Sequence, residues 1–387
     1  MGKPLPHCFG PDHEAFRAAL RTFVDREIAP FVHEWDEAGS FPRELYRRAA
    51  AVGLLGLGYE ERHGGTPADT FFHLVAFEEL ARTGCGGIGA SLLSHTIGLP
   101  PVATWGSEEL KARVLPPVLA GEKISALAVT EPGGGSDVAA LRTTAVRDGD
   151  HYVVNGEKTF ITSGMRADFL TVAVRTDPSN RGAGGISALL IEGDRPGVSR
   201  TALKKMGWWC SDTAHLRFDG VRVPAANLIG PEHQGFKVFM HNFNTERLSL
   251  AAAACMHAQV CLDEATDWAR ERRTFGQPLL ERQVIRHKLV DMALRIEAAR
   301  SFIYELAWRL DHDGAEPAEL VARTCMAKIL ATQAMQFCAD QGVQILGGMG
   351  YMRGTRCERI YREVKVMMIG GGSEEVLKDL AARQLGW

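Results

Sequence analysis

The sequence predicts an α+β protein that is mostly α, with three domains in series. Three observations support this class: apolar residues at helical spacing up to about residue 119, short β-type runs from 125 to 218, and long amphipathic segments after Gly235. We expect a helical N-terminal domain at 1–122, an antiparallel β-barrel or sandwich domain at 123–232, and a C-terminal four-helix bundle at 233–387.

The first domain shows the spacing of amphipathic helices. One apolar stripe recurs every three or four residues and ends before Pro30; it consists of Phe16, Leu20, Phe23, Val24 and Ile28. Similar patterns predict helices at 74–81 and 108–119, with glycine-rich turns between them.

The sequence of the second domain has the pattern typical of β-strands joined by tight turns. Runs rich in β-branched and aromatic residues are separated by Asp-Gly, Asn-Gly and Gly-Gly turns; they lie at 125–129, 151–154, 169–174, 186–191 and 215–218. Their spacing leaves no room for crossover helices, so we expect antiparallel pairing.

The third domain is predicted to be helical throughout. Long amphipathic segments lie at 236–272, 281–311, 317–346 and 373–384, with a glycine cluster at 347–354 before the last one. Four such helices are sufficient for an antiparallel bundle.

Composition excludes several classes of function. The chain has 44 basic and 47 acidic residues and no basic block, so we do not expect a nucleic-acid partner. The eight cysteines show neither C-x-x-C pairs nor metal-ligand spacing, which indicates reduced thiols and no metal. We see no signal peptide and no apolar run of roughly 20 residues, so we expect a cytoplasmic protein without membrane insertion.

Three glycine-containing motifs have the composition of ligand-binding loops. Thr130-Glu131-Pro132-Gly133-Gly134-Gly135-Ser136-Asp137 follows a predicted strand, and its glycines let backbone amides approach a ligand. By itself the composition of this loop favours a flexible connection, and the loop lacks the helix of a dinucleotide fingerprint. The other motifs are Asn155-Gly156-Glu157-Lys158-Thr159-Phe160-Ile161-Thr162-Ser163-Gly164 and Glu271-Arg272-Arg273-Thr274-Phe275-Gly276.

Taken together and in this order, these motifs resemble those of the acyl-CoA dehydrogenase family. The similarity continues through Cys210-Ser211-Asp212-Thr213 and Gln344-Ile345-Leu346-Gly347-Gly348, so it covers nearly the whole chain. It implies a flavoenzyme that binds FAD and converts a saturated acyl-CoA to a trans-2-enoyl-CoA, in fatty acid or branched-chain acyl metabolism. It also implies an electron-transfer flavoprotein as acceptor and a homotetramer or dimer.

The resemblance assigns roles to individual residues. The implied flavin-ring contacts are Thr130, Phe160 and Thr162. The residues implied to hold the remainder of FAD across a subunit boundary are Arg272, Thr274, Phe275, Gln283, Gln344, Gly347 and Gly348. The implied substrate contacts are Ser136, Phe243, Asn244 and Arg247. Without the family, Arg272 would be read as a solvated cation at a helix end.

Glu246 is the candidate general base. It shares one helix face with apolar neighbours, namely Phe236, Phe239, Phe243, Leu250 and Ala253, and burial there would raise its pKa. The alternative is a helix glutamate that pairs with Arg247 or with a neighbouring element. In the isovaleryl-CoA and long-chain branches, a base at this position accompanies glycine where other members carry glutamate, and we assign that glycine to Gly370. Its backbone N–H is expected to stabilise the enolate.

Other acids and bases remain as rivals. Glu374 and Glu375 follow Ser373, which reads as a helix N-cap, and His95 and His257 read as packed residues. Two positions depart from the family pattern. Phe160 stands where tryptophan is common beside the flavin, and Leu127 stands where many relatives have an aromatic residue. Both changes could alter the redox potential of the flavin or its electron partner.

Two alternative functions stay open. One is a biosynthetic dehydrogenase or oxidase that acts on a carrier-protein-bound acyl group, and the other is a catalytically silent acyl-CoA-binding scaffold. Within the leading interpretation, the glycine assigned to position 370 favours a branched or bulky acyl chain.

Overall fold

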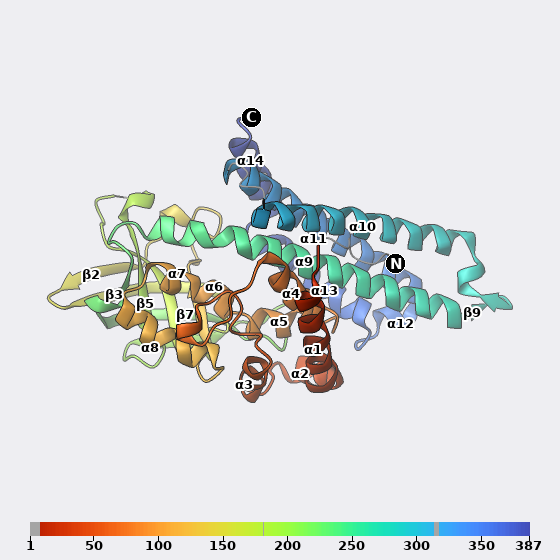
Figure 1. Cartoon of the computed structure of the whole chain (residues 1–387), viewed down its shortest axis with the longest axis horizontal. Helices are drawn as coiled ribbons and strands as arrows, with labels where there is room; N and C mark the ends of the chain where they lie inside the picture. The colour runs from red at the N-terminus through yellow and green to blue at the C-terminus, as the bar shows by residue number, and fades with distance from the viewer. Residues whose placement is uncertain (1–7, 181, 313–316) are drawn as a thin grey trace.

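The computed structural model describes residues 8–180, 182–312 and 317–387. Figure 1 shows a sheet at one end of an elongated molecule, a helical bundle reaching the other end, and N-terminal helices against the middle. The order of helical, β and helical parts confirms the predicted fold class. The domain limits at 122 and 232 stay predictions. None of the helices described is both long and apolar enough to cross a membrane.

The N-terminal part is a set of short helices. The α-helices are α1 (Pro11–Glu27), α2 (Val32–Ala38), α3 (Glu44–Ala51), α4 (Thr70–Ala81), α5 (Gly86–Leu92), α6 (His95–Gly98), α7 (Pro100–Trp105) and α8 (Glu108–Leu119). Helix α8 has the predicted limits, and α4 begins earlier than predicted because Asp69 caps it by accepting from the backbone N–H groups of Phe71 and Phe72.

The central sheet has eight strands in the order β6-β7-β3-β2-β4-β5-β8, with β1 beside β4. Their bounds are β1 (Ser125–Ala128), β2 (Thr144–Asp148), β3 (His151–Thr162), β4 (Phe169–Arg175), β5 (Ile186–Glu192), β6 (Val198–Ala202), β7 (Thr213–Pro224) and β8 (Leu228–Ile229). The predicted all-antiparallel pairing needs one correction, because β1 and β2 both run parallel to β4. The β2–β3 hairpin lies between β1 and β4 in sequence, so the chain can return in the same direction without a crossover helix.

The C-terminal part is built on three long helices, α9 (Gly235–Glu271), α10 (Gln283–His312) and α11 (Pro317–Leu346). A small hairpin, β9 (Arg273–Thr274) and β10 (Gln277–Pro278), joins α9 to α10. After the short α12 (Gly348–Tyr351), the chain forms α13 (Arg356–Ile369) and α14 (Glu374–Gln384). Helix α13 was not predicted, although its buried residues Cys357, Ile360, Val364 and Met367 recur at helical spacing and pack on α9 and α11.

A cluster of buried polar groups joins the three parts of the chain. Asp36 of α2 forms ion pairs with Arg359 and Arg362 of α13. The sulfurs of Cys85 and Cys210 lie 3.5 Å apart beside Asp36. All eight cysteines are free and buried, and the close approach of these two thiols to a carboxylate could not be seen from their sequence spacing.

Glu363 of α13 lies in the same region and is fully buried. Its Oε2 accepts a hydrogen bond of 2.8 Å from the Gly86 backbone N–H, whereas its Oε1 has no partner among the described residues. Burial raises the pKa of Glu363 to about 8, and the charge of Asp36 acts in the same direction. The carboxyl is therefore neutral in the folded protein at neutral pH.

A Glu363→Gln substitution should increase thermal stability relative to the wild type as pH rises. The folded pKa exceeds the unfolded one, so the wild type loses stability between about pH 5 and 8, while the neutral amide does not titrate. Melting temperatures measured across this range should show a difference that widens with pH. Glu375→Gln, at an exposed site, is the control, and a constant difference for Glu363→Gln would contradict a neutral buried carboxyl.

Candidate active site

Helix α9 carries the candidate base from the sheet into the bundle. It begins at Gly235, where a methyl group would lie only 2.4 Å from the backbone of Ser187 in β5. Glycine therefore allows the helix to start directly against the sheet. Glu246 follows 11 residues later, about 16 Å along the helix axis.

Glu246 holds a carboxylate oxygen out of water. Although part of its side chain is accessible, Oε2 is buried and has no hydrogen-bond partner in the described structure. Burial raises the pKa of Glu246 to about 7, and the charges of Arg247 and Lys328 limit the rise. Glu246 forms no ion pair within the described ranges, either with Arg247 or with a residue of another element.

The glycine run after α13 forms the facing wall of the site. The Gly370 N–H donates to the Val366 carbonyl over 2.7 Å and closes α13, so it is not a free donor. Gly371 has a φ of +67°, and a methyl group there would lie 3.7 Å from Glu246 Oε1 and 2.8 Å from Leu250 Cδ1. Gly371 therefore lies nearer to Glu246 than Gly370 does, and the role expected of Gly370 stays a prediction.

Two cations hold this turn. Arg247 Nε donates to the Gly371 carbonyl over 3.1 Å, and its NH1 donates to Asn244 Oδ1 over 3.1 Å. Lys328 Nζ donates to the carbonyls of Met368 and Gly372. The Arg247 guanidinium also lies 5.8 Å from the centre of the Phe243 ring. Three predicted substrate contacts, Phe243, Asn244 and Arg247, are therefore brought together beside Glu246.

Thr130, Phe160 and Thr162 gather at one part of the sheet. The Thr159 N–H donates to the Thr130 carbonyl over 2.9 Å, which joins the glycine loop to β3 next to Phe160. Phe160 is 69% exposed and has a positive φ of 61°, unusual for a large side chain. Ser136 is exposed on the glycine loop, and no described contact connects it to Glu246.

A buried ion pair fixes the glycine loop. Lys158 Nζ donates to Glu131 Oε1 over 2.8 Å and to the Val129 carbonyl over 3.0 Å. The same carboxylate accepts from the backbone N–H groups of Arg142 and Thr143. The loop is therefore anchored at its base, which argues against a merely flexible connection.

The remaining predicted cofactor residues lie at the other end of the molecule (Figure 1). Arg272, Thr274, Phe275 and Gln283 belong to the β9–β10 connection or its borders. The Arg272 side chain has no partner among the described residues, and Phe275 is 97% exposed. Twenty-six residues of sequence, about 39 Å along α9, separate Arg272 from Glu246.

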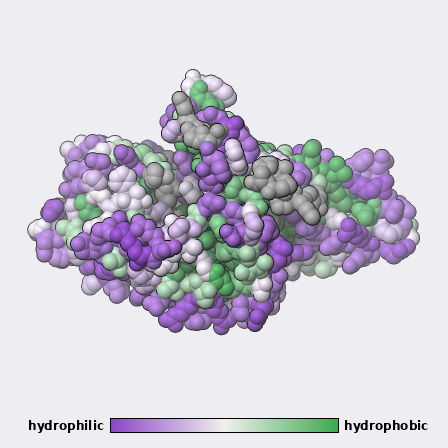
Figure 2. Space-filling model, in the orientation of Figure 1, coloured by the Kyte–Doolittle hydropathy of each residue, from purple (hydrophilic) through white to green (hydrophobic). Residues whose placement is uncertain are grey.

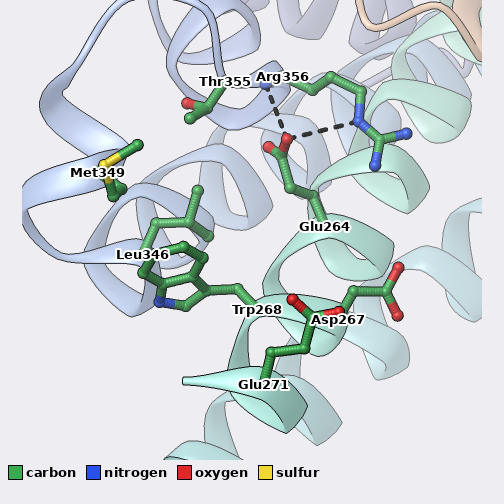
Figure 3. A pocket seen from close by; sticks show the side chains of 8 residues that line it. All are labelled: Glu264, Asp267, Trp268, Glu271, Leu346, Met349, Thr355 and Arg356. Atoms are coloured by element: carbon green, nitrogen blue, oxygen red, sulfur yellow. Dashed lines mark hydrogen bonds and ion pairs between the residues drawn. The ribbon is translucent and has the colours of Figure 1, made fainter. Parts of the chain in front are cut away.

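A pocket shows that this end of α9 adjoins Leu346 and Met349, the residues on either side of Gly347 and Gly348. Figure 3 shows Trp268 and Glu271 of α9 across from Leu346 and Met349. Glu264 closes one side by accepting from the backbone N–H of Arg356 at the start of α13. The structure thus gathers the predicted cofactor residues into two separate sets.

The rival acids and bases lie elsewhere. Glu374 Oε1 accepts from Gln333 and Lys378, and Glu375 is exposed at the start of α14. His95 is buried and contacts the Leu55 carbonyl through Nε2. His257 is buried three turns along α9 from Glu246, and burial lowers its pKa to about 4.

Sequence reasoning missed two buried lysines, Lys158 and Lys328. Lys328 stands on the buried face of α11 together with Cys325 and Ala331. The sequence could have singled out Lys328, since a lone lysine on an apolar helix face predicts a buried ammonium that needs hydrogen-bond acceptors in the protein.

Comparisons with known proteins point to one family over most of the chain. Models for the N-terminal, middle and C-terminal domains of acyl-CoA dehydrogenase match residues 10–122, 126–221 and 233–386. The long-chain specific mitochondrial acyl-CoA dehydrogenase of Rattus norvegicus is 36% identical over 97% of this chain and 87% of its own length.

Two solved structures extend the comparison. A probable acyl-CoA dehydrogenase from Mycobacterium abscessus is 47% identical, with a TM-score of 0.94 over 98% of this chain and 100% of its own. A glutaryl-CoA dehydrogenase from Mycobacterium smegmatis, solved with FADH2, is 26% identical, with a TM-score of 0.91 over 99% and 96%.

The Glu246 carboxyl should titrate near pH 7. Infrared difference spectra between the wild type and Glu246→Gln, recorded as a function of pH, should show a protonated carboxyl band that disappears around this value. The subtraction removes the contribution of Glu363, which is also buried. A band lost already near pH 4.5, the ordinary value for glutamate, would show that the carboxyl is well hydrated.

Proposed function

The chain belongs to the acyl-CoA dehydrogenase family, and on that premise we propose that it converts a saturated acyl-CoA to the trans-2-enoyl-CoA with Glu246 as general base. It is an FAD-dependent oxidoreductase. The observation that supports the assignment of the base is the buried, unpartnered Oε2 of Glu246 beside Gly371.

The environment of Glu246 suits abstraction of a weakly acidic proton. A carboxylate that has lost hydration gains driving force when it becomes a neutral acid, and a pKa of about 7 leaves a large ionised fraction at neutral pH. The proton on C2 of the thioester is acidified by the adjacent carbonyl. Glu246 takes this proton, and its Oε2 atom is shielded from water.

Gly371 is the proposed backbone donor to the thioester carbonyl. Its N–H has no partner among the described residues, in contrast to that of Gly370. A donor aimed at the carbonyl oxygen stabilises the negative charge that develops when C2 loses its proton. Arg247 supports this arrangement by holding the Gly371 carbonyl.

The residues fit FAD. Open space surrounds Gly133 and Gly134, so their amides can approach a ligand, and Phe160 presents an exposed aromatic face beside Thr130 and Thr162. At the other end, Arg272 offers an unpaired guanidinium suited to a pyrophosphate. When bound, FAD supplies the acceptor for the hydride that leaves C3.

We also propose a homo-oligomer, a dimer or tetramer. Arg272 and Phe275 lie far from Thr130 and Phe160 within one chain, so a second copy must bring the two sets onto one cofactor. Figure 2 shows apolar side chains gathered over the part of α10 nearest the β9–β10 hairpin, where Val284, Val290 and Leu294 are exposed. A second copy would cover such a face.

The acyl chain is proposed to be branched or bulky near C3. Gly371 puts no side chain between the turn and Glu246, where even a methyl group would lie 2.8 Å from Leu250 Cδ1 and 3.7 Å from Glu246 Oε1.

The electron acceptor is proposed to be an electron-transfer flavoprotein. The alternative is a biosynthetic enzyme that uses a carrier-protein thioester or reduces oxygen. Comparing acyl-CoA with acyl carrier protein substrates, and measuring peroxide release, separates these functions. The scaffold alternative is opposed by Glu246, which retains the surroundings of a base.

Glu246→Gln should abolish substrate-dependent flavin reduction while acyl-CoA still binds. In anaerobic mixing with a panel of acyl-CoAs, the wild type should bleach its flavin at a rate that rises with pH through about 7, because Glu246 must be ionised. The variant should be slower by about 100-fold or more. Glu375→Gln is the control, and a Glu246→Gln enzyme with wild-type rates would assign the base to another residue.

Isovaleryl-CoA should be a better substrate than butyryl-CoA, which has the same backbone without the methyl branch. Gly371→Ala should reduce the ratio of their kcat/KM values, because the added methyl group would lie 2.8 Å from Leu250 Cδ1 and 3.7 Å from Glu246 Oε1 and would displace groups beside the carboxylate. Gly53→Ala, at a positive φ in open space, controls for backbone strain. Equal or faster turnover of butyryl-CoA by the wild type would contradict the proposed substrate class.

A further inference from the structure

Lys328 is a buried cation that contacts the active-site turn from the opposite helix. It lies on α11 and is only 1% exposed. A buried ammonium loses hydration, so its N–H groups need acceptors within the protein. Nζ donates to the Met368 carbonyl over 3.2 Å and to the Gly372 carbonyl over 2.8 Å.

These two carbonyls bracket the Ile369–Gly371 segment. Met368 lies in the last turn of α13, where carbonyls lack helical partners and a cation is favoured by the helix dipole. Gly372 has a φ of +107°, so the chain here follows a path that other residues rarely adopt. The Lys328 ammonium joins the end of the helix to this glycine.

Arg247, which lies on α9, holds the same turn from a second side by donating to the Gly371 carbonyl. Neither Lys328 nor Arg247 has a carboxylate within ion-pair distance in the described structure. Both cations therefore direct their N–H groups to main-chain carbonyls. Held on two sides, the turn keeps Gly371 next to Glu246 Oε1.

We propose that Lys328 is a positioning residue that holds the Gly370–Gly372 turn against Glu246, so that the base and the Gly371 N–H keep one geometry toward the thioester. This inference rests on the proposed function. Lys328 touches neither the reacting carbon nor the leaving proton in this scheme, and it acts through the turn and through its charge.

The positive charge of Lys328 has a second effect, on the pKa of Glu246. The groups whose charges act on Lys328 are Glu246 and Arg247 from α9, Cys325 from α11 and Glu374 from α14. Lys328 lowers the pKa of Glu246, in opposition to burial, and Arg247 does the same. Loss of the ammonium should therefore make Glu246 harder to ionise and move its titration to higher pH.

The test compares Lys328→Met, Lys328→Arg and, as a matched control, Lys378→Met at an exposed site on α14. Each FAD-loaded enzyme is mixed anaerobically with the best acyl-CoA of the wild type, and the rate of flavin reduction is recorded against pH. Lys328→Met should be slower by about tenfold or more at its plateau. Its pH midpoint should lie about one unit higher than that of the wild type.

Lys328→Arg retains the charge and N–H donors, so its midpoint should stay at the wild-type value and its rate should exceed that of Lys328→Met. Lys378→Met should behave as the wild type. A Lys328→Met enzyme with the wild-type rate and midpoint would overturn the inference. If Lys328→Met does not fold, the pH midpoint of Lys328→Arg decides. A midpoint displaced by one pH unit from that of the wild type would overturn the inference, and an unchanged midpoint would support it.

Glu246→Gln separates this failure from failure of the proposed function. If Glu246→Gln still reduces its flavin at the wild-type rate, the assignment of the base is wrong, whatever Lys328 does. If Glu246→Gln is inactive and Lys328→Met is unchanged, only the role of Lys328 is wrong.

Discussion

The arrangement of the candidate site depends on Glu246, whose carboxyl group has an oxygen buried away from water and no direct ionic partner in the described structure. Glu246 has a buried oxygen with no hydrogen-bond partner in the described structure, and two cations nearby bind main-chain carbonyls. Such an arrangement costs folding free energy, because an ionised group loses hydration that no ion pair replaces. Costs of this kind are typical of sites where a reactive protonation state is required.

The cations serve two purposes at moderate distance from the carboxylate. Had Arg247 or Lys328 paired directly with Glu246, the pKa would have fallen and the base would have been weakened. Their N–H groups instead bind the carbonyls of Met368, Gly371 and Gly372. The turn is thereby fixed, while the field of the two charges keeps the pKa of Glu246 near 7.

The long helix α9 relates the parts of the molecule to one another. Its start lies against β5, its middle carries Glu246, and its end adjoins the glycine cluster near Gly348. The two sets of predicted cofactor residues are therefore held at opposite ends of one rigid element. This arrangement supports a cofactor site completed by a second copy of the chain.

Sequence alone determined the order of helical and β parts, the limits of the long helices and the candidate base, because periodicity and motif order are local properties. Tertiary structure decided the parallel pairing of β1 and β2 with β4, the role of α13 and the place of Lys328. It also places Gly371 nearer to Glu246 than Gly370, a difference that two adjacent glycines do not show in the sequence. Only backbone conformation and the neighbouring carboxylate show which of them lies nearer to Glu246.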